Sequence, residues 1–265
     1  MQDRMREAVS DNFAVHWPYK QPKTGRGLRK SMLHDQWAEA GAVFGVTAGW
    51  ERPLWFAKGP EEQDLPYSVR RQPWEPIAAR EAKAMAEGAA LLDLTPFTKI
   101  DMSGPDALSA LQSLATANLN VDEAVAVYTP FLNARGGIEL DVTVTRLGED
   151  AFRITSGAAT RWRDLDFLKR NLSGQSLKIV DRTEAESVIG IMGPNARALL
   201  QTLSDDDWNA FPFSTSREVI VARVVCRATR ISFVGELGWE LGVRTEDASR
   251  LFGPCLLYTS PSPRD

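Results

Sequence analysis

The chain has 265 residues, of which 43% are hydrophobic and 25% are charged, and its formal net charge is −4. These proportions are typical of an ordinary globular protein, and the acidic balance argues against nucleic acid as a partner, despite a basic cluster between residues 20 and 30. No apolar run approaches the roughly 18 residues that cross a bilayer, so we expect no membrane partner either.

Residues 1–66 differ in pattern from the rest of the chain. The stretch 12–31 is basic and interrupted by Pro and Gly, which predicts loop or extended chain. Ser31 is a candidate N-cap for a short helix, and residues 41–56 are expected to form a buried, aromatic-rich connection. We interpret residues 1–66 as a linker segment that precedes a larger domain at residues 67–254.

The larger domain mixes helical and strand patterns along its length. Helices are predicted at 76–89, 106–115, 159–172, 195–204 and 246–252. Strands are predicted at 91–94, 98–103, 124–132, 138–146, 151–156, 176–181, 187–192, 217–226, 229–234 and 239–243. Because strands joined by hairpins outnumber strand-helix-strand units, we expect an α+β fold with mostly antiparallel sheets and packed helices.

A short internal repeat supports two related subdomains. Residues 102–114 and 191–203 both contain Gly-Pro, then Asp106 or Asn195, then a helix with Leu on one face. In both copies a strand is expected to run into a turn and a helix capped by Asp or Asn. The alternative is chance similarity between two common helix starts.

The last eleven residues, CLLYTSPSPRD at 255–265, have a different character. Back-translated with suitable codons, they match a transposase adapter used in sequencing libraries. We therefore expect the native part of this chain to end near Pro254 and to be a fragment, truncated at both ends, of a longer protein. On this interpretation residues 255–265 are non-native and have neither regular structure nor packed contacts. The alternative is a disordered Ser/Pro tail.

Few residues are available for thiol, histidine or metal chemistry. With Cys255 assigned to the tail, Cys226 stands alone in a strand-like run, where we expect a small core residue, no internal disulfide and a reducing compartment. His16 and His34 both lie in the linker segment. We therefore expect no Ser-His-Asp group, no Cys-His group and no structural zinc site.

Two segments carry the candidate chemistry. In VYTPFLNARGGIELDVTVTRL, residues 127–147, a Gly-Gly turn is expected to join two strands, and Asp141 lies on the polar face of the second strand. In ISFVGELGWEL, residues 231–241, Gly235 and Gly238 frame a turn that is followed by Glu240. A carboxylate on a polar strand face is usually just solvated, so the residues alone favour solvated carboxylates at Asp141 and Glu240, and Tyr128 could be a core residue.

These segments resemble the folate-binding domain of the aminomethyltransferase family, to which glycine-cleavage T-protein belongs. The nearest likeness is to the copy fused to flavin-dependent dimethylglycine and sarcosine dehydrogenases, whose linker resembles TGRGLR and AGAVFGVTAGWERPLWF here. The resemblance implies that Asp141 faces the reactive nitrogen of tetrahydrofolate and that Glu240 binds the pterin. It places Tyr128 and Phe233 in the same site, with Phe233 replacing the Tyr of the family pattern Y-T-G-E-D-G-[FY]-E. Phe213 is a further candidate for the wall of the site.

The function implied by this resemblance is one-carbon transfer. A flavin would oxidise an N-methyl amine to an iminium, and this chain would capture the carbon as 5,10-methylenetetrahydrofolate. The chain has no G-x-G-x-x-G fingerprint, so FAD is expected in a preceding domain of the same protein and not here. The alternatives are an aminomethyltransferase of glycine cleavage and a non-catalytic folate-binding or scaffold module. A bacterial cytoplasmic location is expected, or the mitochondrial matrix in a eukaryote.

Overall fold

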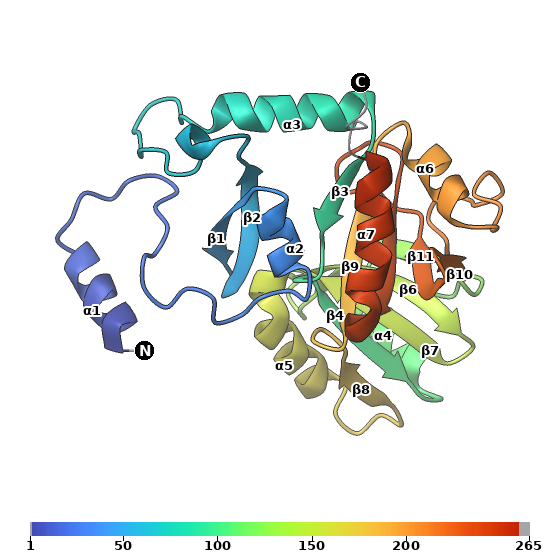
Figure 1. The fold of residues 1–265 in the computed structure, drawn as a ribbon. Helices are drawn as coiled ribbons and strands as arrows, with labels where there is room; N and C mark the ends of the chain where they lie inside the picture. The colour runs from blue at the N-terminus through green and yellow to red at the C-terminus, as the bar shows by residue number, and fades with distance from the viewer. Residues whose placement is uncertain (1, 260–265) are drawn as a thin grey trace. The chain divides into compact units, whose positions relative to one another are not determined.

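The structure is a computed structural model that describes residues 2–259 and divides into two compact units, residues 1–88 and 89–265 (Figure 1). Within residues 2–259, no helix is long and apolar enough to cross a bilayer. The division follows a helix that ends at Glu87, whereas the sequence pattern changes near residue 67. The predicted boundary between residues 66 and 67 remains a proposal.

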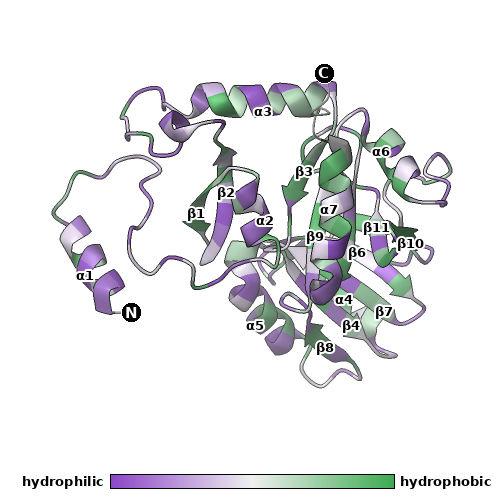
Figure 2. Ribbon diagram, viewed as in Figure 1, coloured by the Kyte–Doolittle hydropathy of each residue, from purple (hydrophilic) through white to green (hydrophobic). Residues whose placement is uncertain are grey.

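The first unit is built around a β-hairpin. Its elements are α1 (Gln2–Asp11), α2 (His34–Glu39), β1 (Ala42–Thr47), β2 (Trp50–Phe56), the 3₁₀ turn Pro60–Glu62 and α3 (Glu75–Glu87). The predicted connection at residues 41–56 is thus an antiparallel hairpin, turned at Ala48 and Gly49 with positive φ. The predicted cap is wrong, because α2 begins after Leu33 and has no side-chain cap. Helix α1 is mostly hydrophilic and buries no residue (Figure 2).

The second unit contains two five-stranded antiparallel sheets. The first has the order β5 (Ala126–Leu132), β6 (Ile138–Gly148), β7 (Ala151–Ser156), β4 (Thr98–Ser103), β8 (Lys178–Asp181). The second has the order β10 (Ser216–Val221), β11 (Val224–Thr229), β12 (Gly238–Arg244), β9 (Glu186–Met192), β3 (Ala90–Asp93). The helices are α4 (Ala107–Leu114), α5 (Arg161–Asn171), α6 (Ala196–Leu203) and α7 (Ala248–Thr259), with 3₁₀ turns at Ala158–Thr160 and Thr245–Asp247.

The two sheets repeat one topology, which confirms the predicted α+β fold with two related subdomains. In each half one strand, β4 or β9, leads to a helix and then to a three-stranded meander. The last strand of the meander, β7 or β12, is central in the sheet and pairs with β4 or β9. A second helix follows each meander. The fifth strand of the second half, β3, comes from the chain before β4. The repeated sequences occupy equivalent places, at the β4–α4 and β9–α6 junctions.

Each of these two junctions turns at a glycine. Gly104 and Gly193 have φ of 141° and 129°, a region that disfavours side chains. Asp106 and Asn195 occupy the N-cap positions as predicted, but neither side chain caps its helix. Instead, the Asp106 carboxylate accepts a hydrogen bond from the backbone N–H of Ser176 at 2.6 Å. It therefore ties the helix start to the loop before β8.

The first sheet packs one face on its helices and leaves the other polar. Leu140, Val142 and Val144 of β6 lie in a core formed with α4 and α5. Apolar residues alternate with polar ones along the strands, as predicted. Ile138 departs from this pattern, because it lies at the strand start and is 68% exposed. The polar face of β6 is therefore free to line a site.

Three predicted segments differ from the structure. The strand predicted at 217–226 is two strands, β10 and β11, joined at Ala222 and Arg223. Of the strand predicted at 229–234, Thr229 is the last residue of β11, and residues 230–234 form a loop that leads to β12. Helix α7 continues through residues 255–259 and Cys255 is buried, so the expectation of no regular structure or packed contacts there is wrong. Leu257 is exposed, and residues 260–265 lie outside the described residues. The adapter interpretation remains a prediction.

Candidate functional site

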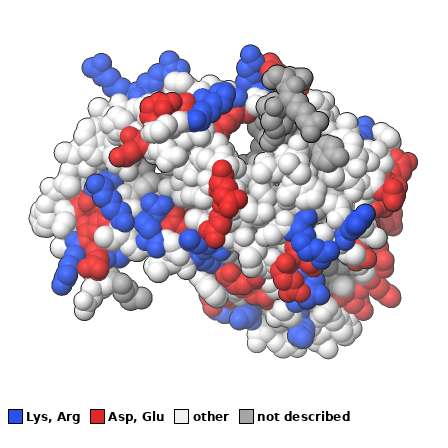
Figure 3. Space-filling view, viewed as in Figure 1, with Lys and Arg blue, Asp and Glu red and all other residues white. Residues whose placement is uncertain are grey.

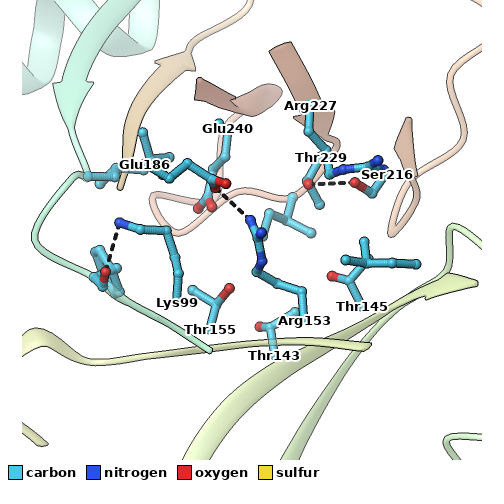
Figure 4. A pocket seen from close by; sticks show the side chains of 16 residues that line it. Lys99, Thr143, Thr145, Arg153, Thr155, Glu186, Ser216, Arg227, Thr229 and Glu240 are labelled. Atoms are coloured by element: carbon cyan, nitrogen blue, oxygen red, sulfur yellow. Dashed lines mark hydrogen bonds and ion pairs between the residues drawn. The ribbon is translucent and has the colours of Figure 1, made fainter. Parts of the chain in front are cut away.

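A cavity lies between the polar faces of the two sheets of the second unit (Figure 4). The space inside it that water-sized molecules can occupy is about 50 Å³. Strands β4, β6 and β7 of the first sheet line one side, and β9 to β12 of the second sheet line the other. The polar lining residues are Lys99, Thr143, Thr145, Arg153, Thr155, Glu186, Ser216, Arg227, Thr229 and Glu240, and the apolar ones include Leu94, Phe97, Val188 and Ile231.

Glu240 is positioned by the alternation of β12. Its neighbours Trp239 and Leu241 are fully buried on the opposite face, so the Glu240 side chain points to the cavity. Burial raises the pKa of Glu240 to about 7, and the charge of Lys99 opposes this rise. Among the described residues, the Glu240 carboxyl has no hydrogen-bond partner. Such a group is suited to accept hydrogen bonds from a bound molecule.

Lys99 reaches the same cavity from β4. Ile100 and Met102 of β4 face the core, so Lys99, which alternates with them, is on the other face of the strand and lines the cavity. Only 2% of its surface is exposed. Its Nζ donates to the backbone carbonyls of Thr95 at 2.8 Å and Phe97 at 3.0 Å. Burial lowers the pKa of Lys99 to about 8, and the charge of Glu186 opposes this shift.

An ion-pair network joins the two sheets across the cavity. Arg153 of β7 donates to Asp101 of β4, from Nε at 2.6 Å and from Nη2 at 3.2 Å. Its Nη1 donates to Glu186 of β9 at 2.6 Å (Figure 4). Burial alone would lower the pKa of Arg153. Its hydrogen bonds and ion pairs with Asp101 and Glu186 outweigh burial and raise the pKa of Arg153 above the ordinary value. Arg153 is therefore a fixed cation that uses three of its five N–H donors to bridge the two sheets.

The predicted pair Asp141 and Tyr128 lies on the polar face of the first sheet. Asp141 is opposite Pro130 on the neighbouring strand, and Tyr128 is opposite Thr143, so the two side chains are diagonal neighbours. The Tyr128 hydroxyl donates a hydrogen bond to Asp141, and this bond raises the pKa of Tyr128. Both side chains are exposed, and Thr143 on the same face lines the cavity.

The two predicted aromatic residues are placed differently. The ring of Phe233 lies 6.5 Å from that of Phe97, which lines the cavity, although Phe233 itself is 80% exposed. Phe213 is 66% exposed in the loop before β10 and does not line the cavity. Of the five predicted residues, the structure thus places Glu240 in the cavity lining. Phe233 lies beside Phe97, which lines the cavity, and Asp141, Tyr128 and Phe213 do not line it. The roles of all five predicted residues stay proposals.

Sequence reasoning missed four charged residues of the cavity, namely Lys99, Arg153, Glu186 and Arg227. A weak signal was present, because Lys99 and Asp101 alternate with Ile100 and Met102 on a predicted strand. Nothing in the local pattern shows that this polar face meets a second sheet. Across residues 2–259, no group of His, Cys, Asp or Glu is arranged to hold a metal ion.

Comparison with known proteins covers most of the chain. The chain is 42% identical to "4-methylaminobutanoate oxidase (formaldehyde-forming)" of Paenarthrobacter nicotinovorans over 90% of its length, and 33% identical to mitochondrial sarcosine dehydrogenase of Homo sapiens over 92%. It spans only 29% and 31% of these two relatives. The crystal structure of glycine cleavage system aminomethyltransferase T from Bartonella henselae shares the fold, with a TM-score of 0.72 and 24% identity over 87% of this chain and 57% of that one.

These similarities confirm the resemblance predicted from the 127–147 and 231–241 segments. They also agree with the two-sheet architecture described above. The model of the GCVT N-terminal domain family matches residues 33–256, which is most of both compact units. The chain therefore belongs to the GCVT N-terminal domain family.

Proposed function

We propose that this chain is the tetrahydrofolate-binding part of an amine-demethylating flavoenzyme and captures the oxidised N-methyl carbon as 5,10-methylenetetrahydrofolate. The observation that carries the proposal is Glu240, a mostly buried carboxyl that has no hydrogen-bond partner among the described residues and faces a polar cavity. Its 42% identical relative is named as a formaldehyde-forming oxidase of an N-methyl amine. The whole protein's substrate is one such amine.

The cavity suits a pterin for chemical reasons. The pyrimidine edge of a pterin carries adjacent N–H donors, and a carboxylate accepts such donors in strong, charge-assisted hydrogen bonds. The flat ring needs apolar walls, which Leu94, Phe97 and Ile231 of the lining can supply. Ion pairing already occupies Arg153 and Glu186, so Glu240 is the carboxylate left for the ligand.

Asp141 would act on the reacting nitrogen. Attack of N5 on the methylene carbon of the iminium, followed by ring closure at N10, transfers two protons from the folate nitrogens to the departing amine. Asp141 would orient N5 and relay its proton, while the hydrogen bond from Tyr128 holds the carboxylate in place. Exclusion of water would protect the iminium from hydrolysis to formaldehyde.

The second candidate is an aminomethyltransferase of glycine cleavage, which the fold similarity to the Bartonella henselae enzyme favours. Such an enzyme releases the one-carbon unit from an aminomethyl group carried on lipoyl protein and needs no flavin domain. Turnover of that carrier by the isolated chain, with tetrahydrofolate and without any amine oxidation, would support the second candidate and contradict the first.

Asp141→Asn tests the capture step in the flavoenzyme that contains this chain. The variant should oxidise the amine at the wild-type rate, but formation of methylenetetrahydrofolate should fall by about 10²–10⁴-fold, with formaldehyde released instead. Asp150→Asn, in the exposed turn between β6 and β7, is the matched control and should behave as wild type. Wild-type product partitioning in Asp141→Asn, with folate bound normally, would remove Asp141 from the mechanism.

A further inference from the structure

We propose that Lys99 is a second polar anchor for the pterin and donates a hydrogen bond to its 4-oxo oxygen while Glu240 holds the adjacent N3–H and 2-amino group. The inference rests on the proposed function, because it assumes that a folate occupies the cavity. It adds a specificity-determining residue that selects a 4-oxo ring over a 4-amino ring.

The first argument is the incomplete bonding of Lys99. An ammonium group has three donors, and two of them are used by the carbonyls of Thr95 and Phe97. Both acceptors are neutral, and Lys99 forms no salt bridge among the described residues. A buried cation usually has a charged partner or a ligand. The third donor is therefore available to an acceptor within the cavity that Lys99 lines.

The second argument is the position of Glu240 on the facing sheet. Figure 4 shows Lys99 and Glu240 reaching into the cavity from opposite sheets. The two groups do not hydrogen bond each other in the described chain, yet the charge of Lys99 acts on the Glu240 carboxyl. A molecule placed between them therefore meets an acceptor on one side and a donor on the other.

The third argument is the chemistry of the pterin edge. Its 2-amino and N3–H donors lie directly beside the 4-oxo acceptor, which is the order that Glu240 and Lys99 can satisfy together. A 4-amino ring presents a donor where Lys99 also offers one, and two facing donors leave buried polar groups unpaired. Arg153 is less suited to this role, because its bonds to Asp101 and Glu186 fix its guanidinium between the two sheets and already neutralise its charge.

The test measures how the variant changes ligand preference. Tetrahydrofolate and tetrahydroaminopterin differ at C4, which carries an oxo or an amino group, and at N3, which carries a hydrogen only in the 4-oxo ring. The N3 difference meets Glu240 in wild type and variant alike, so a change in the affinity ratio between them reports on Lys99. Each ligand is titrated anaerobically into the 265-residue chain. Lys99→Met should weaken tetrahydrofolate about tenfold or more and leave tetrahydroaminopterin within about threefold, so the affinity ratio shifts about tenfold. Lys178→Met, at an exposed position on β8, is the control and should leave the ratio unchanged.

Folding is checked by thermal unfolding of each variant. If Lys99→Met does not fold, Lys99→Gln replaces it, because the Gln amide can still donate to the Thr95 and Phe97 carbonyls but is shorter than Lys. It should shift the ratio in the same direction. If Lys99→Met weakens both ligands equally or weakens neither, the ratio of the two affinities is unchanged. That outcome would overturn the role of Lys99 while leaving folate binding intact. Failure of the wild-type chain to bind either ligand would overturn this inference and the proposed function together.

Discussion

At the scale of single residues, the cavity is defined by groups whose charge is unfavourable in the absence of a ligand. Glu240 has no hydrogen-bond partner among the described residues, and the partners of Lys99 are neutral carbonyls. Both pKa shifts are directed toward the neutral forms because burial removes water from the charged groups. A ligand that accepts a hydrogen bond from Lys99 and donates to Glu240 would offset this loss of hydration. Perturbed pKa values of this kind are typical of binding sites, whereas a structural ion pair would satisfy both groups within the protein.

The pKa of Glu240 predicts how stability depends on pH. Between the ordinary value of 4.5 and about 7, the folded chain keeps a proton that the unfolded chain has lost. The free energy of unfolding therefore falls as pH rises through this window, by at most about 3 kcal/mol. Glu240→Gln does not titrate, so it should match wild type near pH 5 and be more stable by about 1–3 kcal/mol near pH 8.

Denaturant unfolding of both proteins at several pH values checks this prediction. The charged groups that face Glu240 are Lys99, Arg153, Glu186 and Arg227, and all remain in the variant. Their own titration therefore largely cancels when the two proteins are compared. A difference in unfolding free energy that stays constant from pH 5 to pH 8 would show that Glu240 does not carry the raised pKa.

Only part of the site could be predicted from the sequence. Glu240 was predicted from the Gly-framed 231–241 segment, and it lines the cavity. Asp141 and Tyr128 were predicted for the same site from the 127–147 hairpin. They are diagonal neighbours on its polar face, but neither lines the cavity. Lys99 could not be predicted, because its environment depends on a second sheet contributed by residues about 140 positions later in the chain. Tertiary contacts of this kind leave no local pattern.

At the scale of elements, local alternation predicted the first sheet better than the second. Strands β4 and β7 were predicted at their observed bounds, 98–103 and 151–156. The single strand predicted at 217–226 failed because the turn between β10 and β11 uses Ala222 and Arg223, with φ of 49° and 64°. Non-glycine residues rarely adopt these angles, so the sequence carries no Gly or Asn signal for this turn.

The repeated strand-turn-helix junction gives a prediction about stability. A Cβ added at Gly104 would lie 2.5 Å from the carbonyl oxygen of Ser176 and 2.7 Å from Cα of Leu177, so the backbone would have to shift. Gly104→Ala should therefore lower the free energy of unfolding by about 2–4 kcal/mol. Gly136 has φ of 79° but open space around it, so Gly136→Ala should cost only about 1 kcal/mol.

Chemical denaturation of both glycine variants checks this difference. The comparison separates backbone strain, which both variants share, from the steric clash, which belongs to Gly104 alone. Equal losses in the two variants would mean that the loop before β8 yields to the added methyl group. The junction would then not hold α4 against that loop in the way described.

At the scale of the whole molecule, the chain places its charges in two ways. On the surface shown in Figure 3, basic and acidic side chains are interspersed, in keeping with the low net charge. Inside the second unit, two related sheets turn their polar faces toward each other and bring Lys99, Arg153, Glu186 and Glu240 together. The repeat therefore positions the site, because neither half contains all of these groups.

Anaerobic calorimetric titration of tetrahydrofolate at pH 8, into the wild-type chain and Glu240→Gln, tests most directly the claim that this cavity binds tetrahydrofolate. The account predicts one site per wild-type chain and affinity weakened about 10- to 100-fold in the variant, because the amide cannot replace a charge-assisted acceptor. Glu149→Gln, in the exposed turn after β6, should bind as wild type. Equal affinity of wild type and Glu240→Gln, or no binding by the wild-type chain, would contradict the account.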